Sequence, residues 1–343
     1  RCSRDWSSDV CSSDLRQTLL GLYAQADLRV RTNWTLNIGL RAEMVSQLRD
    51  QTGKHVFMPD PLRDTAPQTG EYLLASNPSM PTLSPRVGFR WSPGGRAATV
   101  LQAGFGIYYD HILAYTHGGR RATHPSFDVA VLPNFDSSEY FPDALAAAAR
   151  FASGRARVVL MDYSGSRTPT VYRYTATVQQ RLSGGWEAQL AYVGARGNHL
   201  LRRYESNQFP APITRPDGSL FFPDDCAARR QAQLEPSPLC REGAGTLNPA
   251  FGSIDFLGTD AQSFFNTFQV TASRRVGQIF SLQASYTLSK SVDDDSGGNG
   301  NPQFGPLRTL ERGLSDYDIR HRLSRSEEHT SELQSRLHLV CRL

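Results

Sequence analysis

The main pattern in this sequence is an alternation of apolar and polar residues with a period of two. The segment Trp34–Glu43 reads WTLNIGLRAE and the segment Phe280–Ser289 reads FSLQASYTLS, so that nearly every second residue is apolar. Because successive side chains of a β-strand point to opposite faces, each segment predicts a strand with one apolar and one polar face. The other segments of this kind are Leu20–Val30, Val87–Trp91, Leu101–Tyr109, Tyr172–Gln179, Trp186–Tyr192 and Phe268–Ala272.

The connections between these eight predicted strands alternate between very short and very long. The short ones are rich in turn residues: Thr32–Asn33, Pro93–Gly95, Ser183–Gly185 and Gly277–Gln278. The long ones are Ser46–Ser84, Asp110–Thr170, Arg196–Gln262 and Val292–Asp318. Such loops count against a compact soluble domain but are typical of outer-membrane barrels. We therefore predict an all-β fold, an antiparallel up-and-down transmembrane β-barrel fragment of about 8–9 strands with short periplasmic turns and long extracellular loops.

Hydropathy is compatible with this fold. The mean hydropathy is −0.43 and 39% of the residues are hydrophobic. No uninterrupted apolar run is long enough for a transmembrane helix, which excludes a helical membrane protein. A transmembrane barrel is not excluded, because its strands are apolar on one face only.

The alternation also predicts which side chains line the two faces of a barrel. We expect the lumen-facing wall to include Arg41, Glu43, Arg86, Arg90, Gln102, Arg173, Arg181, Gln189 and Gln283. Charged residues point inward because lipid excludes them, so we interpret this set as wall and not as a binding site. Aromatic residues near strand ends predict an interface girdle: Trp34, Trp91, Tyr108, Tyr109, Trp186 and Tyr286.

Motifs of catalysis and cofactor binding are absent from residues 16–324. They contain no G-x-S-x-G elbow, HExxH site, phosphate loop with GK[ST] or CxxC pair, so we expect no enzyme, no cofactor and no metal site. Gly104 and Gly106 lie within a strand alternation without a following helix, so we interpret them as relieving crowding in the barrel wall and not as binding a nucleotide. Asp293–Asp295 favour a solvated loop over a site for a hard cation. The histidines are predicted to lie on the surface: His111, His117, His124 and His199.

The two ends of the chain carry a different signal. The peptides RDWSSDVCSSDL (Arg4–Leu15) and RSEEHTSELQSR (Arg325–Arg336) can be encoded by opposite strands of one DNA sequence, which resembles a common sequencing-library adapter. We interpret residues 1–15 and 325–343 as adapter-derived and residues 16–324 as a partial outer-membrane β-barrel. We expect the two terminal segments to pack nowhere specific.

Setting the ends aside changes the charge and the cysteine count. The ends carry five basic and six acidic residues, so the net charge moves from +4 to +5. This mild charge, with no basic cluster, gives no sign of a nucleic-acid partner. Of five cysteines, Cys226 and Cys240 remain, both in the third long loop, which is expected outside the cell, where thiols oxidise. We predict a disulfide between them, with two unpaired cysteines as the alternative.

Several segments together resemble a known family. They are LYAQADLRVRTNWTLNIGLRAE, LSPRVGFRWSP with VLQAGFGIYYD, VYRYTATVQQRLSGGWEAQLAYVGARGNHL, FNTFQVTASRRVGQIFSLQASYTLSKSVDD and SDYDIRHRL. They resemble the TonB-dependent receptors in the outer membrane of Gram-negative-type envelopes, in particular the Oar-like group. The resemblance spans nearly all of residues 16–324.

The resemblance implies a barrel of about 22 strands that is plugged by an N-terminal domain. Such a receptor imports a large scarce nutrient, of the siderophore, cobalamin, glycan or peptide class, with energy relayed by the inner-membrane protein TonB. The implied partners are outer-membrane lipid, the plug of the same full-length chain, TonB and an unknown extracellular ligand. We expect the plug and most strands to lie in a part of the parent protein outside this chain.

Two other classes of protein remain open. A passive porin or structural outer-membrane barrel would have the same strands without a plug. A soluble β-sandwich, serving adhesion or carbohydrate binding, would also alternate, but it would hide its apolar faces between two sheets.

Overall fold

The fold was derived from a computed structural model. It describes residues 15–93, 98–113, 156–207, 213–221, 224–225, 240–241, 247–276, 280–296, 302, 304–305 and 307–329. Strands dominate these residues, and the only helical elements among them are two 3-10 turns, Ser183–Gly185 and Arg308–Leu310. No helix in this part of the chain is long and apolar enough to cross a membrane.

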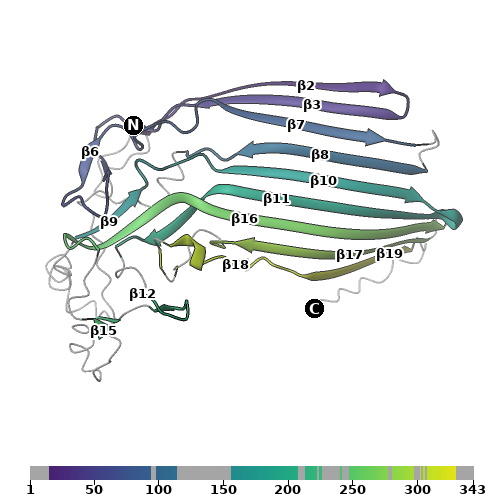
Figure 1. Ribbon diagram of the computed structural model, residues 1–343. Coiled ribbons are helices and arrows are strands. Elements are labelled where there is room, and N and C mark those ends of the chain that lie inside the picture. Colours follow the sequence, from purple (N-terminus) through teal and green to yellow (C-terminus); the bar gives the residue numbers. More distant parts are fainter. Residues whose placement is uncertain are drawn as a thin grey trace, which may run out of the picture.

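The main element is an 11-stranded sheet in which the long strands pair antiparallel and in chain order. Its long strands are β2 (Leu19–Arg31), β3 (Trp34–Val45), β7 (Thr82–Trp91), β8 (Thr99–Tyr109), β10 (Thr170–Arg181), β11 (Trp186–Glu205), β16 (Phe251–Val276), β17 (Phe280–Asp293) and β19 (His321–His329). They lie side by side in Figure 1, with the hairpin turns at one end and the long connections at the other. The predicted antiparallel meander is confirmed.

The pairing register brings the predicted apolar sets onto one face of the sheet. Leu36 pairs with Phe89, and Phe89 pairs with Ala103. Because paired residues of neighbouring strands point to the same side, the row is continuous across the sheet. From β2 to β17 it consists of Leu28, Leu36, Phe89, Ala103, Ala176, Tyr192, Phe268 and Leu288.

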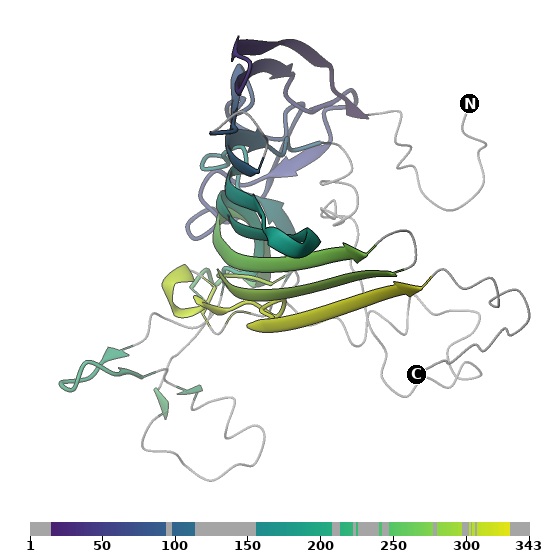
Figure 2. The same cartoon turned by 90° about the vertical axis from the view of Figure 1, so that its right-hand side faces the viewer.

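Among the residues that the structure describes, nothing covers this apolar face. Leu22 is 64% exposed and Leu323 is 77% exposed, and large apolar side chains of the strands between them are exposed as well. Figure 2 shows the sheet as a single curved layer, and the other sheets are two-stranded. A β-sandwich would bury this face against a second sheet, so the described residues contradict the sandwich alternative.

The wall strands continue well beyond the boundaries that the alternation predicts. β11 and β16 remain paired from Trp186 opposite Arg274 to Glu205 opposite Asp255. Irregular pairing between Gly197 and Arg202, with two shifts of register, interrupts this ladder, and His199 there has a φ of 56°. A membrane-spanning strand needs about 9–11 residues, so the part of β11 before His199 is already long enough to span a membrane.

We call the extension of the strands beyond His199, together with the small sheets next to it, the cap. It includes β9 (Ala156–Met161), which pairs parallel to β16, and the hairpin of β5 (His55–Phe57) and β6 (Gln68–Gly70). Short pairs are β1 (Leu15–Arg16) with β4 (Arg49–Asp50), β12 (Ile213–Thr214) with β13 (Leu220–Phe221), and β14 (Asp224–Asp225) with β15 (Cys240–Arg241). β6, β9, β12 and β15 all lie at the end opposite the hairpin turns (Figure 1).

The cap has its own hydrophobic core, which corrects the prediction of plain loops. One buried cluster consists of Val56, Met58, Val158, Leu160, Phe251, Ile254 and Phe256, with Tyr204 packed against it. The stretch Val158–Met161 is apolar at every position, which is typical of a strand buried on both faces and not of a loop. Because this run lacks alternation, a search for period two misses it.

The predicted boundary at Ser324 is not visible in the fold. β19 continues through His329, and Arg325 pairs with Ala284 of β17. The prediction that the C-terminal segment packs nowhere is therefore wrong for residues 325–329. Backbone pairing along a sheet edge requires only an extended chain, so it accepts a sequence without an apolar face. The rest of this segment, and residues 1–14, lie outside the described residues.

Gly194 on the apolar face provides a test of the strand register. A Cβ atom there would overlap the ring of Tyr174, its partner on β10. We expect Gly194→Ala to destabilise the full-length barrel by about 1–3 kcal/mol, the usual cost of overpacking. Heat-dependent gel mobility of the purified barrel measures this effect.

Gly88→Ala is the matched control, because its Cβ would lie at an ordinary 3.5 Å from the nearest atoms, which belong to Asn37. Adding Tyr174→Ala to Gly194→Ala should restore stability in part. Equal stability of the two glycine variants would contradict the register.

Candidate functional site: the polar wall and the cap

The nine predicted wall residues share the polar face of the sheet. Arg90 pairs with Gln102, and Gln189 pairs with Gln179, two residues from Arg181. Gln283 pairs with Ser273, which pairs with Glu187. In the described part of the chain, Arg41 and Arg181 have carboxylate partners, Glu43 and Glu187, whereas Arg86, Arg90 and Arg173 form no ion pair.

Four glycines make a hollow of about 340 Å³ in this polar face. Gly39 pairs with Arg86, which pairs with Gly106, and Gly88 pairs with Gly104 in the next row. Asn37, Thr175 and Arg173 border the same hollow. The prediction that Gly104 and Gly106 relieve crowding is confirmed, because a Cβ on Gly104 would approach Thr175 Oγ1 to 3.2 Å.

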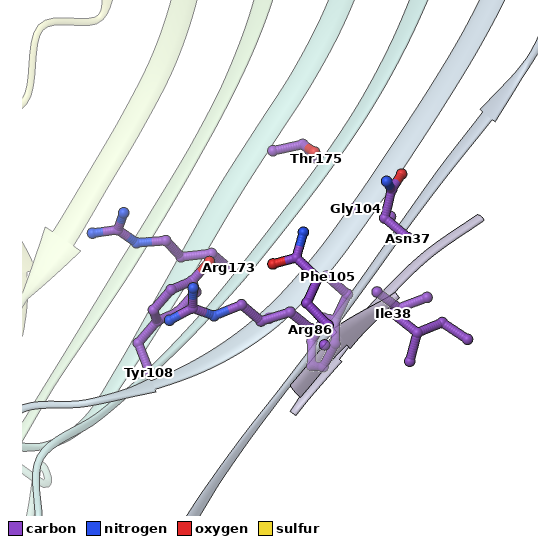
Figure 3. A pocket seen from close by; sticks show the side chains of 13 residues that line it. Asn37, Ile38, Arg86, Gly104, Phe105, Tyr108, Arg173 and Thr175 are labelled. Atoms are coloured by element: carbon purple, nitrogen blue, oxygen red, sulfur yellow. The ribbon is translucent and has the colours of Figure 1, made fainter. Parts of the chain in front are cut away.

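Tyr108 lies over Gly106 between two arginines. A Cβ on Gly106 would come within 3.0 Å of the Tyr108 ring. The guanidinium carbons of Arg86 and Arg173 lie 4.6 Å and 5.3 Å from the centre of this ring, and Figure 3 shows both side chains reaching toward it. Two cations, a phenol hydroxyl and a hollow therefore occur together on the polar face of the sheet.

The position of Tyr108 corrects the girdle prediction. Tyr108 lies two residues from Gly106 and therefore faces the polar side, whereas its neighbour Tyr109 faces the apolar side. Adjacent strand residues cannot both face lipid, so the girdle could not include both. The remaining predicted girdle residues have registers on the apolar face: Trp34, Trp91, Tyr109, Trp186 and Tyr286.

A cluster of polar side chains lies near the end of β3. Arg41 Nη2 donates to Glu43 Oε1 at 2.7 Å, and His111 Nε2 lies 3.5 Å from Glu43 Oε2. His111 is only 7% exposed, so the prediction of a surface histidine is wrong for this residue. His199 is half-buried, and His117 and His124 lie outside the described residues.

Arg202 fixes the cap to the segment that follows β17. It is 1% exposed, and its guanidinium donates to both carboxylate oxygens of Asp260 at 3.1 Å and 2.7 Å. Its third bond, of 2.9 Å, goes to the backbone oxygen of Gly305. The Tyr204 ring lies 4.1 Å from the guanidinium carbon, and burial raises the pKa of its hydroxyl well above the ordinary value. A buried cation with three hydrogen bonds thus holds the cap to the segment around Gly305.

The aspartates after β17 also have a structural role. Asp294 is 5% exposed; its Oδ2 accepts bonds from the backbone N–H of Gln262 at 2.8 Å and from Arg308 Nη1 at 2.5 Å. The solvated-loop prediction is therefore wrong for Asp294. In the described residues no group of three or more His, Cys, Asp or Glu side chains is arranged to hold a metal ion.

The predicted disulfide remains a prediction, because Cys226 lies outside the described residues. The backbone of Cys240 pairs with Asp224, and Arg241 pairs with Asp225. We expect both thiols of the full-length protein to resist maleimide labelling on intact cells until a reductant is added. The bond should stabilise its loop by about 3 kcal/mol. A Cys240→Ser variant, which would expose the Cys226 thiol, provides the labelling control, and labelling of the unaltered protein without reductant would exclude the bond.

One curved antiparallel sheet, with an exposed apolar face, a polar opposite face and tight turns at one end, defines the wall of an outer-membrane β-barrel. Comparison with known families agrees. Residues 3–327 match the outer membrane beta barrel domain, and the chain belongs to this family. The protein is therefore located in the outer membrane, where the apolar face of the sheet is turned toward lipid. No curated protein matches the chain.

The chain is also similar to solved transporters and receptors. The outer membrane transporter YddB from Escherichia coli aligns at 12% identity with a TM-score of 0.49, over 91% of this chain and 31% of its own. The ferripyoverdine receptor of Pseudomonas aeruginosa aligns at 11% identity with a TM-score of 0.41, over 93% of this chain and 26% of its own. The FrpB iron transporter from Neisseria meningitidis aligns at 11% identity with a TM-score of 0.38, over 81% of this chain and 26% of its own. The chain spans less than a third of the length of each.

Proposed function

We propose that this chain forms part of the barrel of a TonB-dependent, Oar-like receptor that imports a large nutrient across the outer membrane. The observation that carries this proposal is the open polar face of the sheet. The order of strands runs from β2 to β17 and β19 without the two ends pairing. A barrel of about 8 strands would already have closed and filled its interior with side chains, whereas barrels of about 22 strands enclose a plugged lumen.

Each part of the wall has a role in this proposal. The cap presents an ordered outer surface to the ligand, because Arg202 and the core around Ile254 hold it in place. The polar wall then lines the passage. The guanidiniums of Arg86 and Arg173 near Tyr108, which form no ion pair in the described part of the chain, offer charged hydrogen-bond donors to a passing ligand. The plug and the contact with TonB belong to the rest of the parent protein.

A passive porin is the main competing function, and conductance separates the two. The full-length protein in a planar lipid bilayer should give almost no steady ion current, because a plug closes the lumen. Removing the plug should open a large conductance. A steady current through the intact protein would favour the porin.

Binding to TonB gives a second test. The full-length protein should retain the periplasmic domain of TonB on an affinity column, and removal of the N-terminal part should abolish retention. A porin would retain none in either form.

A further inference from the structure

A cluster of three cations lies on the lipid-facing side of β11, β16 and β17. Arg196 pairs with Phe264, and the Arg196 guanidinium carbon lies 5.0 Å from the centre of the Phe264 ring. The Arg312 guanidinium carbon lies 4.6 Å from the same ring centre. Lys290 pairs with Asn266, the next residue of β16 on this face. We call Arg196, Lys290 and Arg312 the outer cation cluster.

The cluster lies on the face that the barrel turns to lipid. Phe264 lies four residues and Asn266 two residues from Phe268, which belongs to the exposed apolar row. Side chains at such spacings in a strand share a face. Lys290 lies two residues from Leu288 and Arg196 lies four residues from Tyr192, so both share the face of the apolar row. Charged side chains on this face are costly at mid-membrane and tolerated at the interfaces.

The length of the strands places the cluster at the outer border of the membrane. Near the hairpin turns, Trp186 pairs with Arg274 on the lipid face. From Arg274 the strand shows Ala272, Val270 and Phe268 to lipid before it reaches Asn266. The strand segment from Arg274 to Asn266 therefore has the length of about 9–11 residues that a β-strand needs to cross the hydrocarbon. The turns are periplasmic in such barrels, so the outer cation cluster meets the outer leaflet.

Neighbouring polar groups mark the same level. The hydroxyls of Tyr174 and Tyr192 both donate to Asn266 Oδ1, at 2.9 Å and 2.7 Å. Tyrosines with hydrogen-bonded hydroxyls are typical of the headgroup region. The amide oxygen is thereby satisfied, while Lys290 beside it is exposed.

The cations of the cluster lack acidic partners. All three side chains are exposed, and in the described part of the chain none of them forms an ion pair with Asp or Glu. Arg196 Nε donates to the neutral Asn198 Oδ1 at 3.3 Å. Three uncompensated positive charges at a lipid surface attract anionic headgroups, with about a fivefold gain in affinity for each.

We propose that the outer cation cluster binds the phosphate groups of outer-leaflet lipid, with its acyl chains against the apolar row of Tyr192, Phe268 and Leu288. Guanidinium groups suit phosphate because they donate two parallel hydrogen bonds. The outer-leaflet glycolipid is phosphorylated and carries its phosphates at the headgroup level. The proposal does not depend on the transported ligand or on energy coupling.

Native mass spectrometry of the full-length protein tests this site with lipid A carrying two phosphates or none. The unaltered protein should bind the phosphorylated lipid about a hundredfold more tightly, as three contacts of about fivefold each imply. Arg196→Gln with Lys290→Gln and Arg312→Gln should lose this preference. Excess inorganic phosphate should displace little lipid, because it lacks the acyl chains.

The matched control is Arg29→Gln with Arg90→Gln and Arg275→Gln, which removes the same charge from the polar face. It should keep the full preference for phosphorylated lipid. Arg196→Lys with Arg312→Lys keeps the charge and should retain most of the binding, which separates lost contacts from misfolding. Equal binding of both lipids by the unaltered protein, or an unchanged preference in the first triple variant, would overturn the proposal.

Discussion

Expressed alone behind a secretion signal, this chain is expected to aggregate and to transport nothing. In the part of the chain that the structure describes, β2 pairs only with β3, and at the other side β19 pairs only with β17. Both outer edges would expose backbone N–H and C=O groups to hydrocarbon, at several kcal/mol for each unpaired group. Active uptake would also lack the proposed plug. Cell fractionation and energy-dependent ligand accumulation measure the two effects.

The full-length gene is the control for this experiment. Restoring the upstream and downstream coding sequence should restore both insertion and uptake. Uptake by the chain alone that stops when the proton gradient is collapsed would contradict the proposal that energy coupling depends on a plug outside this chain. Sequencing the genomic locus tests the adapter interpretation directly, since the codons of Arg4–Leu15 and Arg325–Arg336 should not occur there.

Arg202→Met in the full-length protein is expected to release the cap. Methionine fills similar space, but it leaves the Asp260 carboxylate and the Gly305 backbone oxygen without this donor. Loss of one partner of a buried pair costs about 3–5 kcal/mol. Because the Asp260 side chain is 46% exposed, we expect the lower end, about 3 kcal/mol. Hydrogen exchange and limited proteolysis on intact cells should show faster opening near Gly305.

The comparison variant is Arg49→Met, which breaks an exposed ion pair with Glu71. Both side chains are about half exposed, so the expected cost is about 0–1 kcal/mol. Similar exchange rates in the two variants would exclude a special role for Arg202. A Gly305→Ala variant gives independent support, because its Cβ would lie 2.5 Å from the Glu205 backbone oxygen and should also loosen the cap.

The alternation of side chains was sufficient to predict the wall. It determines both the strands and their faces, because a shift of one residue would move Leu36 and Ile38 from lipid to the lumen. The order of strands follows from tight turns such as Thr32–Asn33, which force antiparallel neighbours. These features depend on residues close in sequence, which is why one sequence suffices to predict them.

The cap was not predictable in the same way. Its stability depends on contacts between distant segments, such as Arg202 with Gly305 and the parallel pairing of β9 with β16. The girdle prediction is wrong for Tyr108 because an aromatic residue near a strand end can face either side of the sheet. The spacing of two residues from Gly106 determines the side, and it places Tyr108 on the polar wall beside Arg86.

The irregular pairing between Gly197 and Arg202 separates the part of β11 and β16 that forms the barrel wall from the part that belongs to the cap. His199 adopts the left-handed backbone conformation at this point, and the ladder resumes beyond it. The residues on the two sides of the irregularity are therefore under different constraints. Either part can change in sequence without altering the alternation of apolar and polar residues in the other. This makes the irregularity a natural splice point, where the outer portion of one barrel could be exchanged for that of a relative while the membrane-embedded portion keeps its register.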